Sequence, residues 1–338
     1  MARSIRRCAP RAALTLLLVA GSFSSPAAGD ALRVVATSPD LADLARAVGG
    51  DAVEVTSLTK GPQDLHFVEP RPSFVRELHR ADALVLAGMD LEIGWLPALL
   101  RSARNGAVTP GGSGYIDASQ GIEPLEVPTT RVDRSMGDVH PYGNPHYLPD
   151  PLNGLAVARL LRDRFSALQP DAAADFEVGY ARLAKQLVGA LVGAQLAATA
   201  SPDEIAERIA AGELADAPEL GGWLGAARRA ASHLAVQDHR YWPYFARRFG
   251  LEVVDTLEPR PGIAPSTTHL RKVITRIRTE DVKLLLATPY FDPRHARFVA
   301  EHTGVRIVPM AHQAGSRPDT DDYLAAIDYN VRQVFGTN

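Results

Sequence analysis

The sequence predicts an α/β protein with two lobes, each with a mostly parallel sheet flanked by helices, joined by one long helix. Short apolar runs alternate with helical stretches in both halves of the chain, which is typical of parallel sheets covered by helices. Between the halves, residues 171–198 are rich in alanine and leucine and contain no proline, which favours one long helix. We therefore expect an N-terminal lobe at 30–168, a connecting helix at 169–199 and a C-terminal lobe at 200–338.

The first half of the chain contains three apolar runs with strand character, at residues 32–38, 53–59 and 82–88. The stretch PDLADLARAVGG, at 39–50, has helical spacing and ends in glycine, and residues 71–81 are also predicted to be helical. This strand–helix–strand order indicates parallel pairing within the first lobe.

The second half resumes the same alternation. Strands are predicted at residues 233–238, 251–258, 282–289 and 305–311. Residues 201–225 fit neither pattern, and we interpret them as an insertion.

Residues 1–29 have the pattern of a secretory signal peptide. Four arginines precede the apolar run AALTLLLVAGSF and the small-residue stretch SSPAAGDA. The apolar run is too short to span a bilayer as a mature helix, and no later segment is long and apolar enough to do so. The only cysteine, Cys8, precedes this run, whereas a lipid-modified cysteine would follow it. We therefore expect cleavage between Ala27 and Asp30 and a periplasmic protein that is not lipid-anchored.

Charge and cysteine content exclude several classes of function. Of the 36 basic residues, four lie in the signal peptide, which leaves 32 against 39 acidic residues in the mature chain. An acidic surface argues against nucleic acid as a partner. Cleavage also removes Cys8, so no thiol is expected in a catalytic or metal site. We expect a monomer.

Three of the ten histidines stand where ligands bind α/β proteins, beyond the carboxyl ends of strands. His66 follows the strand 53–59 by one loop, and His239 comes directly after the strand 233–238. His146 lies in the proline-stiffened loop GNPHYLPDP. Three imidazoles are a common ligand count for zinc. Taken singly, however, each histidine is more often an ordinary loop or core residue.

The remaining histidines are weaker candidates. His140 is intermediate, because it lies close to His146 in a glycine-rich loop. Five others are interpreted as surface or helix-face residues: His79, His269, His295, His302 and His312.

Four segments carry a resemblance to a known family: DLHFVEPRPS, GNPHYLPDPLN, HRYWPYFARRFGLEVVDTLEPRPGIAPS and VKLLLATPYFDPRHARFVAEHTGVRIV. The chain resembles the periplasmic solute-binding proteins of zinc and manganese ABC transporters over essentially its whole mature length. This resemblance implies two α/β lobes, a rigid connecting helix and a metal ion buried between the lobes.

The resemblance also implies three ligands. His66 matches the family's first histidine, which is followed by Glu-Pro, and His146 matches the second, in an Asn-Pro-His motif. His239 matches the third, ahead of aromatic residues. Pro145 and Pro149 restrict the backbone on either side of His146, which suits a preorganised ligand.

The fourth ligand is where the chain departs from the family, which usually has Glu or Asp in a pattern such as Glu-Pro-Tyr. Here the motif reads ATPYFD, and Thr288 takes the place of the carboxylate. A threonine hydroxyl is a poor zinc ligand. Asp292, His140 or water are the alternatives for the fourth position. We expect weaker binding or altered selectivity, and loss of binding remains an alternative.

The predicted function is therefore non-enzymatic: binding of a divalent transition metal ion and delivery to the permease of an ABC transporter. Zn²⁺ is expected over Mn²⁺, because manganese prefers oxygen donors. One alternative is a secreted zinc-dependent hydrolase, since three histidines and an open position also suit catalytic zinc. Against it, the chain has no His-Glu-x-x-His helix and no nucleophile elbow. Another alternative is a receptor of the same fold that has lost metal binding.

Overall fold

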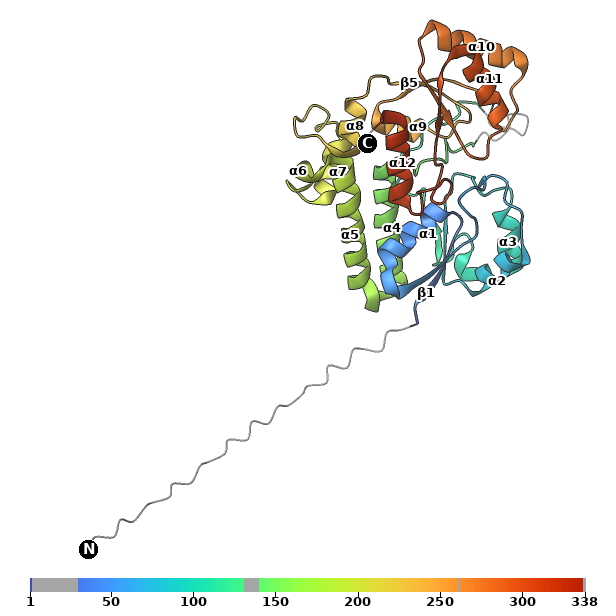
Figure 1. Cartoon of the computed structure of the whole chain (residues 1–338). Helices are drawn as coiled ribbons and strands as arrows, with labels where there is room; N and C mark the ends of the chain where they lie inside the picture. The colour runs from blue at the N-terminus through green and yellow to red at the C-terminus, as the bar shows by residue number, and fades with distance from the viewer. Residues whose placement is uncertain (2–29, 131–139, 261, 337–338) are drawn as a thin grey trace. The chain divides into compact units, whose positions relative to one another are not determined.

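The computed structural model describes Met1 and residues 30–130, 140–260 and 262–336. From Ala31 onward the chain forms one compact unit that contains two four-stranded parallel sheets (Figure 1). The predicted signal peptide, apart from Met1, lies outside the described residues. Across the described part of the chain, no helix combines the length and the apolar character that crossing a membrane requires.

The first sheet has the strand order β2-β1-β3-β4, and all of its pairs are parallel. Its strands are β1 (Leu32–Ala36), β2 (Val53–Ser57), β3 (Ala83–Leu86) and β4 (Tyr115–Asp117). The strands β1 to β3 match the predicted runs, whereas no strand was predicted at β4, which has only three residues.

Both faces of the first sheet are covered because its central strands are apolar on both sides. Val34 and Ala36 face the main core, to which α1 (Pro39–Gly49) contributes Leu41 and Leu44. Val35 points to the opposite face and packs with α2 (Pro72–Arg80) and α3 (Leu96–Ala103). The apolar runs of the central strands β1 and β3 are therefore buried on both faces.

The second sheet repeats this arrangement with the order β6-β5-β7-β8. Its strands are β5 (Leu234–Gln237), β6 (Glu252–Thr256), β7 (Leu284–Ala287) and β8 (Arg306–Pro309). The outer face packs against α10 (Thr267–Thr279) and α11 (Pro293–Thr303). The inner face packs against α9 (Pro243–Phe249) and α12 (Tyr323–Phe335). All four strands match predicted runs.

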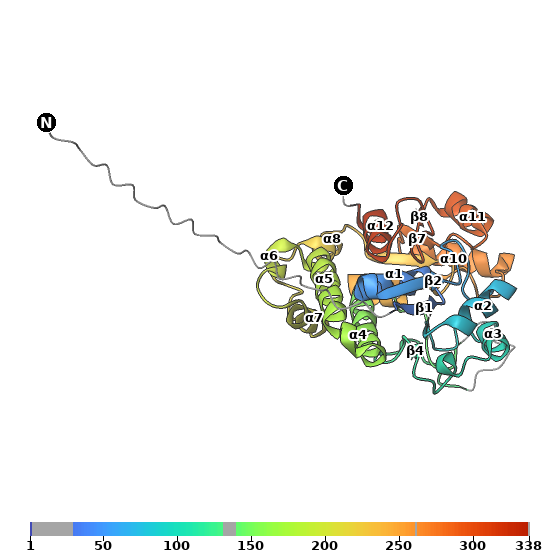
Figure 2. The same cartoon turned by 90° about the horizontal axis from the view of Figure 1, so that it is seen from below.

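Two long helices pack against each other and against α1 (Figures 1 and 2). The helix α4 (Pro151–Leu168) begins where the Asp150 carboxylate accepts the Leu152 N–H and Pro151 fills the first turn. The second, α5 (Ala173–Val192), ends at Gly193, whose φ of 83° lies in the left-handed region.

The stretch predicted as one connecting helix thus contains a 3₁₀ turn (Pro170–Ala172), α5 and the short α6 (Ala194–Ala197). The stretch interpreted as an insertion holds α7 (Pro202–Ala210) and most of α8 (Gly222–Arg228).

One apolar core runs through both lobes. It joins the inner faces of both sheets to α1, α4, α5, α8 and α12. Turning one lobe against the other would expose part of this core to water, which is unfavourable in proportion to the apolar area. The fold therefore holds the carboxyl ends of the two sheets close to each other, and the loops that follow the strands meet there.

Candidate metal centre

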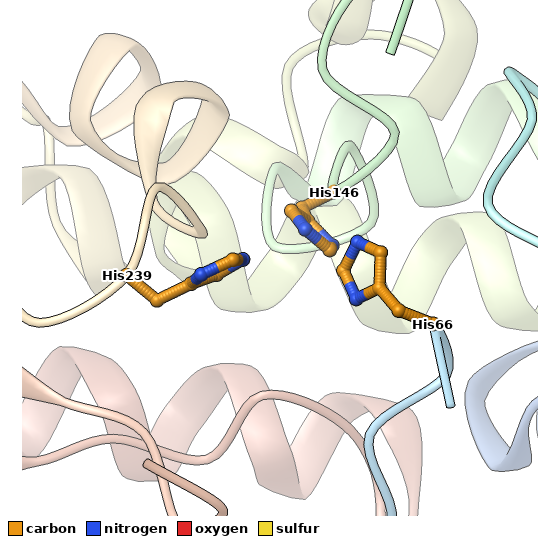
Figure 3. Close-up of side chains that lie close together, drawn as sticks. All are labelled: His66, His146 and His239. Atoms are coloured by element: carbon orange, nitrogen blue, oxygen red, sulfur yellow. The ribbon is translucent and has the colours of Figure 1, made fainter. Parts of the chain in front are cut away.

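Three histidine side chains converge between the two sheets: His66, His146 and His239 (Figure 3). One ring nitrogen of each lies within 4.8 Å of those of the other two. Two nitrogens bound to one zinc ion are at most about 4.2 Å apart, twice a Zn–N bond of about 2.1 Å. A small rotation of the rings therefore brings all three onto a single ion.

His66 is positioned by the loop that follows β2. Its Nδ1 lies 2.7 Å from the Asp64 carboxylate, which also accepts the His66 backbone N–H at 3.0 Å. The Trp95 indole N–H donates to the carbonyl of Leu65 at 2.9 Å and fixes the same loop from α3's start. Because Nδ1 is engaged by a carboxylate, Nε2 is the nitrogen left to bind an ion.

His146 is held by the loop before α4. Its backbone N–H donates to the Asn144 side chain at 2.9 Å, and its ring stacks on Tyr241 with centroids 4.1 Å apart. Burial, with the neighbouring imidazoles of His66 and His239, lowers the pKa of His146 well below its usual value. The ring is therefore neutral, which is the form that binds metal ions.

His239 lies two residues after β5, at the carboxyl end of the second sheet. Its Nδ1 lies 2.6 Å from Glu258, which follows the neighbouring strand β6, and both side chains are less than a tenth exposed. The His239 backbone N–H donates to Asp238 at 2.7 Å. The second lobe thus presents Nε2 of His239 toward the two histidines of the first.

Asp64 and Glu258 were missed by the sequence reasoning. A histidine that binds a metal ion usually donates its other ring N–H to a carboxylate or carbonyl, which fixes the ring and raises its basicity. Asp64 could have been predicted as such a partner, because it lies only two residues before His66. Glu258 gave none in the sequence, because only the pairing of β5 with β6 brings it to His239.

Thr288, at the position where the resemblance implies a carboxylate ligand, is hydrogen-bonded to Asp238. Its hydroxyl donates to Asp238 at 2.9 Å, and its backbone N–H donates to the same carboxylate oxygen at 2.6 Å. Burial raises the pKa of Asp238 to about 7, against the lowering effect of these hydrogen bonds. Thr288 therefore links the end of β7 to the end of β5 through hydrogen bonds.

Asp292, the second candidate, begins α11. Its carboxylate accepts the Arg294 N–H at 2.9 Å as a helix cap and forms an ion pair with the Arg294 guanidinium. These hydrogen bonds lower the pKa of Asp292 to about 2. It does not belong to the cluster of possible ligands among the described residues.

His140, the third candidate, contacts one member of the histidine cluster, His66, although it is not itself one of the three clustered ligands among the described residues. Its Nε2 lies 3.1 Å from Nε2 of His66, and the two ring centroids are 5.2 Å apart. Two nitrogens on one tetrahedral zinc ion are about 3.3 Å apart. Burial, with the neighbouring imidazoles of His66 and His239, lowers the pKa of His140 to about 3, so this ring is neutral.

The interpretation of His312 as a surface or helix-face residue is wrong, since its side chain is buried. Its Nε2 lies 3.1 Å from the carbonyl of Gln63, and its carbonyl accepts the Tyr241 hydroxyl. The misassignment arose because MAHQAG follows a strand and carries no helical or strand periodicity. His312 thus links the loop after β8 to the loop that carries His66.

The comparisons with known proteins agree on one family. A family model described as zinc-uptake complex component A, periplasmic (ZnuA), matches residues 34–204 and 220–335. The manganese ABC transporter substrate-binding lipoprotein PsaA of Streptococcus mitis is 20% identical over 327 residues, covering 95% of this chain and 94% of that protein. The metal ABC transporter substrate-binding lipoprotein SsaB of Streptococcus sanguinis is 20% identical over 329 residues, covering 96% and 94%. The predicted resemblance is confirmed.

Solved structures show the same fold. A crystal structure of ZnuA superimposes with a TM-score of 0.67 at 21% identity, covering 91% of this chain and all of that one. A manganese-bound periplasmic metal-binding protein from Candidatus Liberibacter asiaticus gives 0.64 at 18% identity, covering 90% and 98%. The predicted fold class is confirmed.

The predicted localisation needs correction. The expectation that the protein is not lipid-anchored is wrong, because the curated relatives are named lipoproteins, whereas an extracytoplasmic role agrees with them. That expectation depended on the position of Cys8 ahead of the apolar run, and Cys8 lies outside the described residues.

Proposed function

Because the chain belongs to the family of the zinc-uptake complex component A, periplasmic, we propose that it binds a divalent transition metal ion outside the cytoplasmic membrane and delivers it to the permease of an ABC transporter. The convergence of His66, His146 and His239 carries this proposal. The metal ion is cargo, and no catalytic role is assigned to the site. The comparisons favour neither a hydrolase nor a receptor that has lost metal binding.

The ligand atoms follow from the hydrogen bonds of the rings. His66 and His239 present Nε2, because their Nδ1 atoms are paired with Asp64 and Glu258. His146 supplies the third nitrogen from a loop fixed by Asn144. One ion is thus bound by ligands from both lobes. The N-terminal lobe, at 30–168, supplies two of them and the C-terminal lobe, at 200–338, supplies one, and the segment 169–199 connects the lobes.

We propose zinc as the cargo. The histidine cluster offers imidazole nitrogens, which suit zinc, whereas carboxylate and water oxygens suit manganese. Among the described residues, the cluster contains no carboxylate, since Asp64 and Glu258 face the outer sides of the rings. The curated relatives named for manganese make Mn²⁺ the competing cargo.

Calorimetric titration of the demetallated protein with Zn²⁺ and with Mn²⁺ tests both levels of the proposal. We expect one equivalent of zinc to bind at least a hundredfold more tightly than manganese. Tighter binding of manganese would overturn the choice of zinc but not the proposed function. Binding of neither ion would overturn the proposed function itself.

A further inference from the structure

Three consecutive residues after β3 adopt left-handed backbone conformations: Gly88, Met89 and Asp90, with φ of 77°, 51° and 63°. Only Gly88 takes such a conformation without steric cost. A side chain at Gly88 would also collide with Asp117, because a Cβ there would lie 2.0 Å from the Asp117 Oδ1. The chain therefore maintains a strained turn, named here the Gly88–Asp90 turn, whose Asp90 lines the same cavity as His66 and His140.

The turn is anchored from within. The buried Glu92 carboxylate accepts the N–H groups of Ala87 and Gly88, at 2.7 and 3.2 Å, and the Thr37 hydroxyl at 2.6 Å. The Leu91 N–H closes the turn on the Gly88 carbonyl at 3.0 Å. Backbone strain that is held in place by surrounding hydrogen bonds is characteristic of functional sites.

The backbone of the turn acts on His140. Hydrogen bonding to the backbone of Met89 and of Asp90 raises the pKa of His140, against the larger lowering effect of burial, and its Nε2 lies 3.1 Å from Nε2 of His66. A carbonyl on the far nitrogen is the partner that orients a metal-binding imidazole. Beyond this pair a cavity of about 640 Å³, lined in part by His66, His140 and Asp90, leads away from the cluster.

We propose that His140 is the fourth metal ligand and that the Gly88–Asp90 turn is the device that positions it. The inference rests on the proposed function and deepens it. His140 would take the role of the carboxylate that the family usually has at the position of Thr288. It lies on the side of the site that faces the cavity. The ion is then bound by four imidazoles, which strengthens the preference for zinc over manganese.

Variants at His140 and Asp90 test this role. His140→Ala is expected to weaken zinc binding by more than tenfold, since a direct bond to the ion is lost. Asp90→Gly keeps the carbonyl but frees the backbone of the turn, and we expect a loss of roughly tenfold, as for other groups that orient metal ligands. Asp90→Asn, which tolerates the left-handed conformation, is expected to bind zinc within about threefold of the parent.

A double-mutant cycle separates positioning from a general structural effect. In the His140→Ala background, Asp90→Gly should leave zinc affinity unchanged. Equal losses in both backgrounds would show that the turn does not act through His140. Parent-like zinc binding by His140→Ala would overturn the fourth ligand while leaving the proposed function intact, whereas failure of the parent to bind zinc would overturn both.

A matched control and a spectroscopic measurement complete the test. Arg104, the left-handed residue that ends α3 with φ of 51°, lies outside the cluster, so Arg104→Gly should not change zinc affinity. The visible absorption of bound Co²⁺ should indicate four nitrogen ligands in the parent and change in His140→Ala and Asp90→Gly, but not in Arg104→Gly. An unchanged spectrum in His140→Ala would contradict the assignment.

Discussion

Glu258 accepts a hydrogen bond from Nδ1 of His239 over 2.6 Å, and the two residues follow the neighbouring strands β6 and β5. This contact selects the tautomer of His239 whose Nε2 lone pair faces the histidine cluster. Asp64 does the same for His66 within its own loop. In each lobe, a carboxylate behind the ring therefore orients the imidazole toward a dication.

Glu258→Gln is accordingly expected to weaken zinc binding by roughly 10- to 100-fold, the usual effect of losing a partner behind a metal ligand. The amide still fits the space but no longer carries the charge that favours a cation. Calorimetric titration with zinc measures the change. Glu280→Gln, at an exposed glutamate after α10, is the matched control and should bind as the parent does.

Replacing His66, His146 or His239 by alanine should each lower zinc affinity by at least tenfold, because each removes one bond to the ion. His302→Ala serves as the control, since that ring is hydrogen-bonded to the Phe298 carbonyl on exposed α11. Competition with a chelator of known affinity measures all four variants. Parent-like binding by any of the three would remove that residue from the ligand set.

Most of the fold could be predicted from the sequence because its central strands are buried on both faces and read as apolar runs. The exceptions have local causes. The strand β4 is too short for a periodic signal, and Gly193 ends α5 inside a stretch that otherwise has uniform helical character. The sequence shows the apolar pattern of a helix more clearly than the point at which it stops.

The site was predictable only in part. Two of the three histidines follow strands, and the third lies in a proline-stiffened loop. Both features can be recognised in one sequence without an alignment of homologues. Their partners depend on pairings distant in sequence: β5 with β6 for Glu258, and β5 with β7 for the contact between Thr288 and Asp238. Neither pairing is encoded in a local spacing.

Thr288→Val is expected to lower stability and leave zinc affinity nearly unchanged. The substitution keeps the shape of the side chain but removes a donor from the buried Asp238 carboxylate, at a cost of about 1–3 kcal/mol. Urea denaturation of the metal-free protein measures the first effect, and zinc titration measures the second. A large loss of zinc affinity with unchanged stability would instead place Thr288 at the ion.

Asp292→Ala should likewise leave zinc affinity unchanged and lower the melting temperature slightly. The reason is that its carboxylate caps α11 and pairs with Arg294. Asp292→Asn, which retains a capping oxygen, should recover most of the loss. A fall in zinc affinity for both variants would indicate that Asp292 moves to the ion when metal binds.

Asp40 gives the protein a dependence on pH that is separate from the ligands. Its carboxylate, on α1, accepts the Ala314 N–H from the loop after β8 at 2.6 Å and is fully buried. Burial raises the pKa of Asp40 to about 7 from 3.8. Between these values the folded protein holds a proton that the unfolded chain has released, so this group lowers the free energy of unfolding as pH rises from about 4 to about 7.

Asp40→Asn should remove that contribution while keeping an acceptor for the Ala314 N–H. The free energy of unfolding of the variant, minus that of the parent, should therefore rise through this pH range, by at most about 1.4 kcal/mol per pH unit for one proton. His312, whose pKa is lowered to about 4 by burial, acts in the opposite sense, but it is present in both proteins and cancels in the difference. Urea denaturation of the metal-free proteins between pH 4.5 and 8 provides the measurement, with Asp175→Asn, at an exposed position in the first turn of α5, as the control. Parallel stability curves for Asp40→Asn and the parent would show that Asp40 is ionised throughout this range and that its burial does not set the pH dependence.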